Sequence, residues 1–323
     1  MAMSDKRYLL IVNPVSGTWN KRGLADTVTR RLSDAGVSVE TRFTAGAGDA
    51  TRLARMAVVQ CYDAVIAAGG DGTINETASA LCNTNVPLGI IPSGSGNGLA
   101  RHLNIPLEPK PAIDVIAKGY VVNCDYGTVN GRPFFCTFGV GFDATVSDAF
   151  SRQGRRGEFM YVKSALAEYA RYNPQVYTIS ANGKTLTEKA FIVACCNASQ
   201  YGNNAYIAPK ANIADGLLDI TIIHAGNPFD MARVGVDLFT GYIDRNVMIH
   251  SFRAPSAVIC RAEGGPAHLD GEPVVMDDMM EVKCHRQSLG IFTPENAPEF
   301  RPIITPLSCF FRDVKTTLCR IFQ

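Results

Sequence analysis

The stretch Tyr62–Cys82, YDAVIAAGGDGTINETASALC, decides the fold of this chain. It opens with an apolar run of strand length, Tyr62–Ala68, and continues into the glycine-rich loop GGDGT at residues 69–73. A helical pattern of apolar residues then covers Ile74–Cys82. A strand that ends in glycines and enters a helix is typical of open α/β sheets, whose ligands bind beyond the carboxyl ends of the strands.

The same alternation of strand and helix recurs on both sides of this stretch. The predicted strands are Arg7–Val12, Val37–Phe43 and Pro87–Ile91, and the predicted helices are Gly23–Ala35 and Ala50–Gln60. A second glycine-rich loop, SGSGNG at residues 93–98, follows the last of these strands and leads into a short helix. This order predicts a parallel sheet that is covered by helices on both faces.

After about Val122 the chain reads as strands with turns between them, and a second, mostly antiparallel β domain is expected. Asn130-Gly131 and Asn182-Gly183 are strong hairpin signals. Helical patterns interrupt the strands at Glu158–Tyr172 and Pro228–Tyr242, and the last stretch, Leu307–Phe322, is helical again. The predicted strands are Asn123–Val129, Arg132–Phe138, Val176–Asn182, Thr187–Asn197, Leu217–His224, Arg253–Arg261 and Met280–His285.

Composition excludes several classes of protein. The 323 residues suggest about two domains. With 46% apolar and 19% charged residues the chain is globular, and a net charge of +1 gives no bulk field for nucleic acid. No apolar run approaches the ~18 residues of a membrane-spanning helix, and the N-terminus has no signal-peptide core, so a cytoplasmic protein is expected. The ten cysteines include no CxxC pair and are expected to be reduced.

The two glycine-rich loops favour phosphate binding. Glycines let the backbone approach a phosphate, and the N-terminus of the following helix presents free N–H groups. Neither loop is a Walker P-loop. Asp71 fits such a loop only if a cation such as Mg²⁺ on a nucleotide offsets its charge, whereas a tight turn is the alternative for one loop taken alone. The GxGxxA string at Gly139–Ala144 fits a β hairpin better than a dinucleotide site.

Two later clusters contain carboxylates at predicted turns. In HLDGEP, residues 268–273, Glu272 is either a solvated turn residue or a general base at a domain cleft. In NIADGLLD, residues 212–219, the residues alone favour a plain turn over a small cation site with oxygen ligands.

Taken together, the motifs resemble those of the diacylglycerol kinase catalytic family, which includes bacterial lipid kinases, sphingosine kinases and ceramide kinases. They are NPxSG at 13–17, GGDGTINE at 69–76, PxGSGN at 92–97, ADGLLD at 214–219 and DGE at 270–272. They follow the family's order over nearly the whole chain. The resemblance implies an α/β plus β fold: a Rossmann-like N-terminal domain, residues 1–122, rejoined by the tail 294–323, and a C-terminal antiparallel β-sandwich, residues 123–293. It also implies ATP and Mg²⁺ in a cleft between the domains.

The resemblance further assigns roles to residues. Glu272 would take the proton from the lipid hydroxyl, Asp71 would organise Mg²⁺–ATP, and Asp125 would belong to the metal network. Asp215 would bind a structural Mg²⁺ through its carboxylate, and Asn212 and Leu217 through their carbonyls. The residues expected to contact ATP are Asn13, Thr44, Gly69, Gly70, Asp71, Gly72, Thr73, Ile74, Asn75, Ser95, Gly96 and Asn97.

The substrate stays open between diacylglycerol, a sphingoid base and a ceramide. Gly94-Ser95-Gly96-Asn97 is closer to the loop of sphingosine and ceramide kinases than to the Gly-Thr-Ala-Asn-Asp of many bacterial members. Two other functions are the alternatives, a kinase similar to NAD kinase and a catalytically silent lipid-binding protein. NAD kinase would explain GGDGT but not the other motifs together, and Asp71, Asp125 and Glu272 argue against a silent protein.

A lipid substrate implies peripheral contact with the inner face of the membrane. The basic segment 151–157 is one candidate surface. The amphipathic segment 309–322 is another, although docking on the N-terminal domain is the better prediction for it. The resemblance also implies a possible homodimer, and no nucleic-acid partner is expected.

Overall fold

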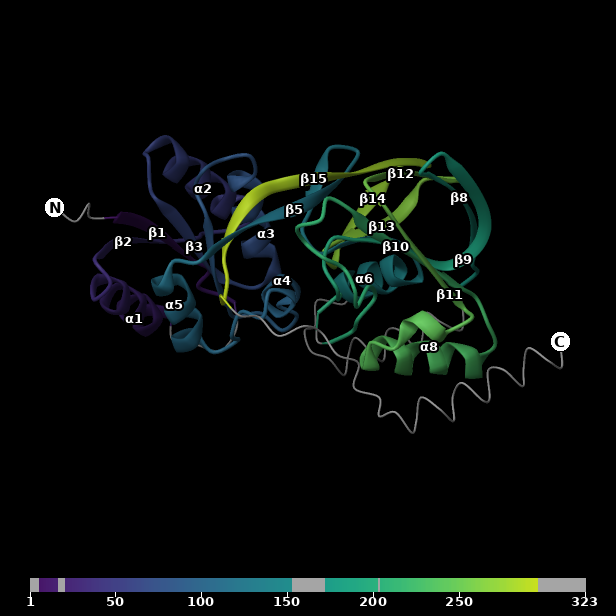
Figure 1. Cartoon of the computed structure of the whole chain (residues 1–323), viewed down its shortest axis with the longest axis horizontal. Helices are drawn as coiled ribbons and strands as arrows, with labels where there is room; N and C mark the ends of the chain where they lie inside the picture. The colour runs from purple at the N-terminus through teal and green to yellow at the C-terminus, as the bar shows by residue number, and fades with distance from the viewer. Residues whose placement is uncertain (1–5, 17–20, 153–171, 203, 296–323) are drawn as a thin grey trace.

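The computed structural model describes residues 6–16, 21–152, 172–202 and 204–295 (Figure 1). The helix expected at Glu158–Tyr172 and the helical tail Leu307–Phe322 lie outside these ranges, apart from residue 172. Within them, no helix has the length and apolar character needed to span a bilayer. The eight cysteines described there are all free thiols, as expected.

The N-terminal domain is a parallel sheet between two layers of helices. Its strands lie in the order β2-β1-β3-β4. They are β1 (Lys6–Val12), β2 (Val37–Phe43), β3 (Ala64–Gly69) and β4 (Leu88–Pro92). The helices are α1 (Lys21–Ser33), α2 (Asp49–Val59), α3 (Asp71–Leu81), α4 (Gly98–His102) and α5 (Pro109–Lys118). The predicted α/β domain is confirmed.

Alternation along β1 explains why the sheet is covered on both faces. Leu9 and Ile11 join the core beneath α2 and α3, whereas Leu10 and Val12 join the core beneath α1 and α5. Successive side chains of a strand point to opposite faces, so an unbroken apolar strand needs cover on each side.

The C-terminal domain is an antiparallel sheet with two apolar clusters, a smaller one, which includes Ile192 and Val234, and a larger core. Phe138, Tyr177, Ile220 and Met280 are fully or almost fully buried in it. Both hairpins expected from Asn-Gly pairs are present, with positive φ at Asn130, Gly131, Asn182 and Gly183. The strands that belong wholly to this domain are β6 (Arg132–Phe134), β7 (Thr137–Gly141), β8 (Gln175–Ala181), β9 (Lys184–Cys196), β10 (Leu218–His224), β11 (Ile249–Ala254), β12 (Ser256–Arg261), β13 (Gly265–Leu269) and β14 (Glu272–Met276). The remaining helices are α6 (Phe142–Arg152), α8 (Pro228–Thr240) and the 3₁₀ helix η1 (Ile243–Arg245).

Two long strands run through both domains (Figure 1). β5 (Val121–Val129) and β15 (Met279–Phe292) pair antiparallel along their length. Val282 of β15 lies in the core of the C-terminal domain, whereas Ile291 lies in that of the N-terminal domain and pairs with Leu88 of β4. The division expected after residue 122 therefore falls inside β5.

Four predicted elements differ from the structure. The strand expected at Arg132–Phe138 is divided into β6 and β7 at residues 135 and 136. The strand expected at Met280–His285 continues to Phe292, past a register shift between His285 and Leu289. The strand expected at Arg253–Arg261 is divided at Pro255, which has no N–H to donate. The string Gly139–Ala144 does not form a hairpin, because β7 ends at Gly141 and α6 begins at Phe142. The helices α5 and α6 were not predicted.

Candidate active site

The carboxyl ends of β1, β3 and β4 meet at one edge of the parallel sheet. Asn13 donates from Nδ2 to Thr73 Oγ1 at 2.9 Å, and the hydroxyls of Ser16 and Ser93 lie 3.0 Å apart. Thr44 follows β2, and its N–H donates to the carbonyl of Val12. The structure thus brings Asn13, Thr44 and Thr73 to the edge where they were expected.

The two glycine-rich loops are packed against each other. A Cβ at Gly94 would lie 2.8 Å from the Cα of Gly70, and one at Gly69 would lie 2.5 Å from the Cβ of Thr73. Contacts this short exclude any side chain at both positions. Gly94 is therefore required for the two loops to reach each other, and Gly69 for the first loop to turn into α3.

Asp71 holds the second loop in place. Its carboxylate accepts from the backbone N–H groups of Asn97 and Gly98, at 2.9 and 2.8 Å. A Cβ at Gly96 would lie 2.8 Å from Asp71 Oδ2, so Gly96 makes room for this carboxylate. Asn97 shapes the same loop by bonding to the N–H and carbonyl of Gly94, whereas Ser95 is exposed.

Two residues expected to contact ATP have other partners. Ile74 is 1% exposed and packs in the core of the N-terminal domain. Asn75 donates from Nδ2 to Asp270 Oδ2 at 2.9 Å, across 195 positions of sequence. The structure places Ile74 in the interior and uses the side chain of Asn75 to join the two domains.

Asp270 joins the two domains, and it was assigned no role of its own from the sequence. It begins the two-residue turn between β13 and β14, where φ is +52° at Asp270 and +84° at Gly271. Its carboxylate also accepts from the N–H groups at positions 135, 136 and 137, at 2.8, 2.6 and 2.8 Å. Burial raises the pKa of Asp270 to about 6, although these three donors favour the ionised form. The Asp-Gly pair itself was the available signal for this turn.

Glu272 meets the first glycine-rich loop from the opposite domain. It is the first residue of β14, and a Cβ at Gly72 would lie 2.6 Å from Glu272 Oε1. Partial burial raises the pKa of this carboxyl, and the nearby charges of Glu76 and Asp71 raise it further. A carboxylate with a raised pKa is a stronger base, so this position suits proton abstraction.

Asp125 lies in a different polar cluster. It is fully buried, and its carboxylate accepts from the N–H groups of Gly216 and Gln287, at 2.5 and 2.6 Å. No hydrogen bond or ion pair among the described residues joins it to Asp71 or Glu272. The structure therefore shows Asp125 tying β5 to β15 and to the turn at 213–216, and it gives no support to a catalytic role.

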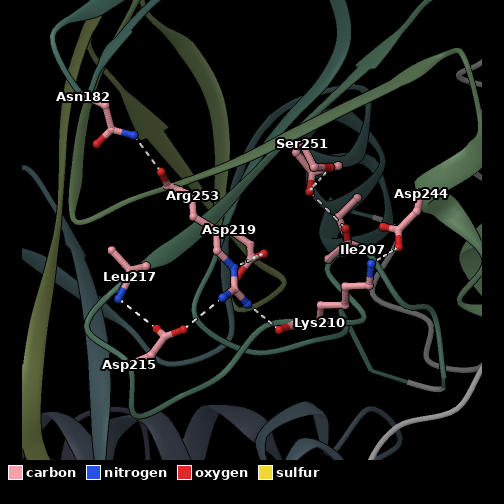
Figure 2. A network of polar contacts seen from close by, with 10 residues as sticks. Asn182, Ile207, Lys210, Asp215, Leu217, Asp219, Asp244, Ser251 and Arg253 are labelled. Carbon is pink, nitrogen blue, oxygen red and sulfur yellow. Dashed lines mark hydrogen bonds and ion pairs between the residues drawn. The ribbon is translucent and has the colours of Figure 1, made fainter.

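An arginine occupies the surroundings of the expected structural metal site. Figure 2 shows Arg253 of β11 with each of its three guanidinium nitrogens bonded to an oxygen. Nη1 bonds Asp215 Oδ2 and Nε bonds Asp219 Oδ1, both at 3.1 Å, and Nη2 bonds the carbonyl of Lys210 at 2.5 Å. Two carboxylates and one carbonyl are thus satisfied by a side-chain cation.

The one carboxylate expected to hold that metal is bonded at both oxygens. Asp215, the one carboxylate of the set, is bonded at its other oxygen by the N–H of Leu217 at 3.0 Å. Elsewhere in the described ranges, no three His, Cys, Asp or Glu side chains are grouped as a metal site.

Asp71 does fit a metal that arrives with a nucleotide. Mg²⁺ takes few protein ligands and prefers carboxylate and phosphate oxygens. Each oxygen of Asp71 accepts one hydrogen bond and keeps a further lone pair.

The candidate membrane segments 151–157 and 309–322 fall mainly outside the described residues.

Family models match both domains. Residues 7–129 match the model described as diacylglycerol kinase catalytic domain, and residues 136–292 match the model described as YegS C-terminal NAD kinase beta sandwich-like domain. The two matches adjoin at the transition between the parallel and antiparallel parts of the chain.

Individual proteins are similar over most of the chain. A diacylglycerol kinase of Mycobacterium tuberculosis is 32% identical over 239 residues, which cover 72% of this chain and 77% of that protein. A diacylglycerol kinase of Bacillus subtilis is 30% identical over 273 residues, covering 83% and 90%. A crystal structure of a diacylglycerol kinase from Bacillus anthracis superposes with a TM-score of 0.73 at 21% identity, over 91% of this chain and 98% of that one. At that identity the superposition shows the fold.

Proposed function

Because the chain belongs to the diacylglycerol kinase family of lipid kinases, we propose that it transfers the γ-phosphate of Mg²⁺–ATP to the hydroxyl of a membrane lipid. Diacylglycerol is the first substrate to test, since similar proteins of M. tuberculosis and B. subtilis are named diacylglycerol kinases. A sphingoid base and a ceramide remain candidates because of the Gly94-Ser95-Gly96-Asn97 loop.

The observation that carries this proposal is the position of Glu272 against Gly72. The two residues come from opposite domains, so a hydroxyl brought by the C-terminal domain would stand next to the nucleotide loop. The lipid oxygen attacks the γ-phosphorus, the bond from that phosphorus to the β,γ-bridging oxygen breaks, and ADP leaves. Glu272 accepts the hydroxyl proton, which an alcohol does not lose readily at neutral pH.

The N-terminal loops would bind the nucleotide. Phosphoryl transfer needs mainly positioning and neutralised charge, and glycine-rich loops beside a helix start provide backbone donors for phosphates. Mg²⁺ bound with ATP would supply the neutralising charge. Asp71 would orient that ion while its hydrogen bonds to Asn97 and Gly98 keep the second loop fixed.

The test is transfer of γ-labelled phosphate from Mg²⁺–ATP to lipids in mixed micelles, using diacylglycerol, sphinganine, sphingosine and ceramide, with NAD as the aqueous acceptor. Labelled product in the organic phase supports the proposal and identifies the lipid. Label on NAD alone supports a kinase similar to NAD kinase. Saturable lipid binding with no transfer to any acceptor supports a silent lipid-binding protein.

Glu272→Gln tests the proposed base directly. It should lower kcat by about 10²–10⁴, the range for loss of a general base, and leave ATP binding intact. Glu281→Gln is the matched control, because Glu281 is an exposed carboxylate of the same domain, on β15. Normal turnover of Glu272→Gln would contradict the proposed role.

We also propose that the enzyme acts in the cytoplasm, at the inner face of the membrane, because its substrate is a lipid. Sedimentation with vesicles containing anionic lipid should pull it down more than sedimentation with neutral vesicles, and added salt should reduce the difference.

The homodimer implied by the family resemblance is a separate proposal, and light scattering in solution would test it.

A further inference from the structure

A buried pair of polar side chains lies behind the turn that carries Glu272. His268 of β13 and Asp143 of α6 are 1% and 8% exposed, and His268 Nε2 lies 3.0 Å from Asp143 Oδ2. The same oxygen accepts from the hydroxyl of Tyr201 at 2.8 Å, and Asp143 Oδ1 accepts from the N–H of Ala144 at 2.8 Å. The carboxylate is therefore bonded at both oxygens by groups from three parts of the chain.

The partners of His268 assign its tautomer. The N–H of Gly271 donates to His268 Nδ1 at 3.3 Å, so Nδ1 is the acceptor and Nε2 carries the hydrogen donated to Asp143. A second ring proton would have to sit on Nδ1, facing the N–H of Gly271. The neutral imidazole thus connects Asp143 to the backbone of the turn.

A glycine in the adjacent strand creates the space for this pair. Gly139 of β7 pairs with His268 of β13 in the sheet. A Cβ at Gly139 would lie 2.3 Å from His268 Nε2 and 2.5 Å from Asp143 Oδ2. The glycine that opens the Gly139–Ala144 string therefore has a specific use, and any side chain there would displace the pair.

The N–H of Gly271 is at the apex of the turn, outside the ladder of β13 and β14. The ladder of this hairpin ends at the pair Leu269 and Glu272. The bond from Gly271 to His268 adds a constraint on the peptide immediately before Glu272, and that peptide helps to set where the carboxylate points.

Tyr201 connects the pair to the nucleotide side of the molecule. The segment that contains Tyr201 packs against the second glycine-rich loop, residues 93–98. A Cβ at Gly202, next to Tyr201, would be 3.1 Å from the Cα of Gly96 in that loop. Nearby, Arg101 of α4 donates to Asn204 at 3.3 Å. A continuous set of contacts thus leads from the loop at 93–98, through Tyr201, Asp143 and His268, to the residue before Glu272.

We propose that Asp143 and His268 are positioning residues that hold Glu272 in line with the nucleotide loop. The inference rests on the proposed role of Glu272 as the base. Proton transfer needs donor and acceptor within hydrogen-bond distance, and a displacement of ~1 Å caused by a distant change can cost ~100-fold in rate. Asp143 orients the imidazole, and the imidazole holds the turn.

Two substitutions of His268 separate its two hydrogen bonds. Asparagine places its amide oxygen near the position of Nδ1, so it keeps the acceptor for the N–H of Gly271 and loses the bond to Asp143. Glutamine places its amide nitrogen near the position of Nε2, so it keeps the donor to Asp143 and loses the bond to Gly271. His268→Gln, which loses the acceptor for Gly271, should lower kcat by about 10- to 100-fold with KM for ATP unchanged. His268→Asn should recover a large part of that loss, whereas equal loss in both variants would contradict the proposal.

A matched variant controls for loss of stability. Thr221 of β10 is fully buried in the same domain and donates to the carbonyl of Ile207 at 3.1 Å. Thr221→Val should lower the Tm and leave kcat near that of the parent protein. If His268→Gln lowers kcat no more than Thr221→Val at a similar loss in Tm, His268 has only a structural role.

If His268→Gln does not fold, Asp143→Asn is the second variant. Asparagine keeps the size of the side chain, but its amide nitrogen must face the N–H of Ala144 or the donors of Tyr201 and His268. It should also lower kcat about 10-fold or more with KM for ATP unchanged. An Asp143→Asn enzyme with normal kcat overturns the proposal.

The double variant Glu272→Gln, His268→Gln separates this inference from the proposed function. If His268 acts through Glu272, the second substitution lowers kcat no further in the Glu272→Gln background. If the loss of kcat in the double variant equals the product of the losses in the two single variants, His268 acts independently of Glu272 and the inference is overturned. Normal turnover of Glu272→Gln alone removes the proposed base and this inference together. If Glu272→Gln has a low turnover and His268→Gln has a normal turnover, this inference is overturned and the proposed role of Glu272 stands.

Discussion

At the scale of single residues, the carboxylates around Glu272 control the pH at which it can act. As the proposed general base, Glu272 must be ionised, so activity should fall as the pH drops through its pKa. Because burial, Glu76 and Asp71 all raise that pKa, the acidic limb of the kcat profile should lie above the pH expected for an ordinary glutamate.

Glu76→Gln should move this acidic limb to lower pH, because it removes a negative charge that raises the pKa of Glu272. Glutamine keeps one of the two acceptors that bind the N–H groups of Gly48 and Ala50 at the start of α2. Profiles of kcat against pH for this variant and for Glu281→Gln provide the measurement. An identical acidic limb in the parent protein and in both variants would show that Glu272 is not the titrating group.

Asp270 is a structural determinant at the same scale. Four donors converge on its carboxylate, three from the backbone and one from Asn75. Asp270→Asn turns an amide nitrogen toward donors and should lower the free energy of unfolding by about 1–3 kcal/mol in urea titrations. Asp114→Asn, which removes an exposed partner of Arg31, should change it by less than ~1 kcal/mol. Equal stability of the two variants would contradict the importance of Asp270.

Glu272 and Asp71 could be singled out from the sequence because their motifs place carboxylates beside glycines. The bonds of Asp270 to Asn75 and to positions 135–137 could not, because they join residues 133 to 195 positions apart. Such pairings depend on tertiary packing within and between the domains, and local patterns contain no information about it. The same limit applies to His268 and Asp143, which are 125 positions apart.

At the scale of elements, periodicity predicted those with an uninterrupted pattern. Of the parallel strands, β3 and β4 are fully buried apolar runs and β1 is buried from Tyr8 onward, and all three were located to within a few residues. The second half of β15 was missed because Gln287, with φ of +47°, interrupts the alternation. α6 was missed because glycines 139 and 141 suggested a turn, whereas Gly139 is there to make room for a buried pair.

The loop at 210–219 and β11 are held together by Arg253, and this leads to a prediction about cations. Arg253→Met leaves the carboxylates of Asp215 and Asp219 without their positive partner and should lower the free energy of unfolding by about 1–3 kcal/mol. Millimolar Mg²⁺ or Ca²⁺ should then recover part of the loss in Tm, because hard cations bind carboxylate oxygens. The Tm of the parent protein without nucleotide should change little when the same cations are added. Stabilisation of the parent protein as large as that of the variant would mean that a metal binds there beside Arg253.

At the scale of the whole molecule, the two domains share β5 and β15, and they should unfold together. Leu289→Ala removes a side chain that is 1% exposed in the N-terminal core and should cost about 2–5 kcal/mol. Val282→Ala, on the same strand in the C-terminal core, is the matched variant. Calorimetry should give one transition for each protein, with equal calorimetric and van't Hoff enthalpies. Two separate transitions in either variant would show that the domains unfold independently.

The path of β15 also has a consequence for synthesis on the ribosome. β4 pairs with β3 on one side and with the end of β15 on the other, where Ile291 meets Leu88. About two hundred residues separate these partners along the chain. A nascent chain therefore has most of its first domain available long before the strand that borders β4 has been translated. The unfinished sheet edge would remain open to wrong pairing during that interval, so this protein is expected to depend on chaperones most strongly when translation is slow near its end.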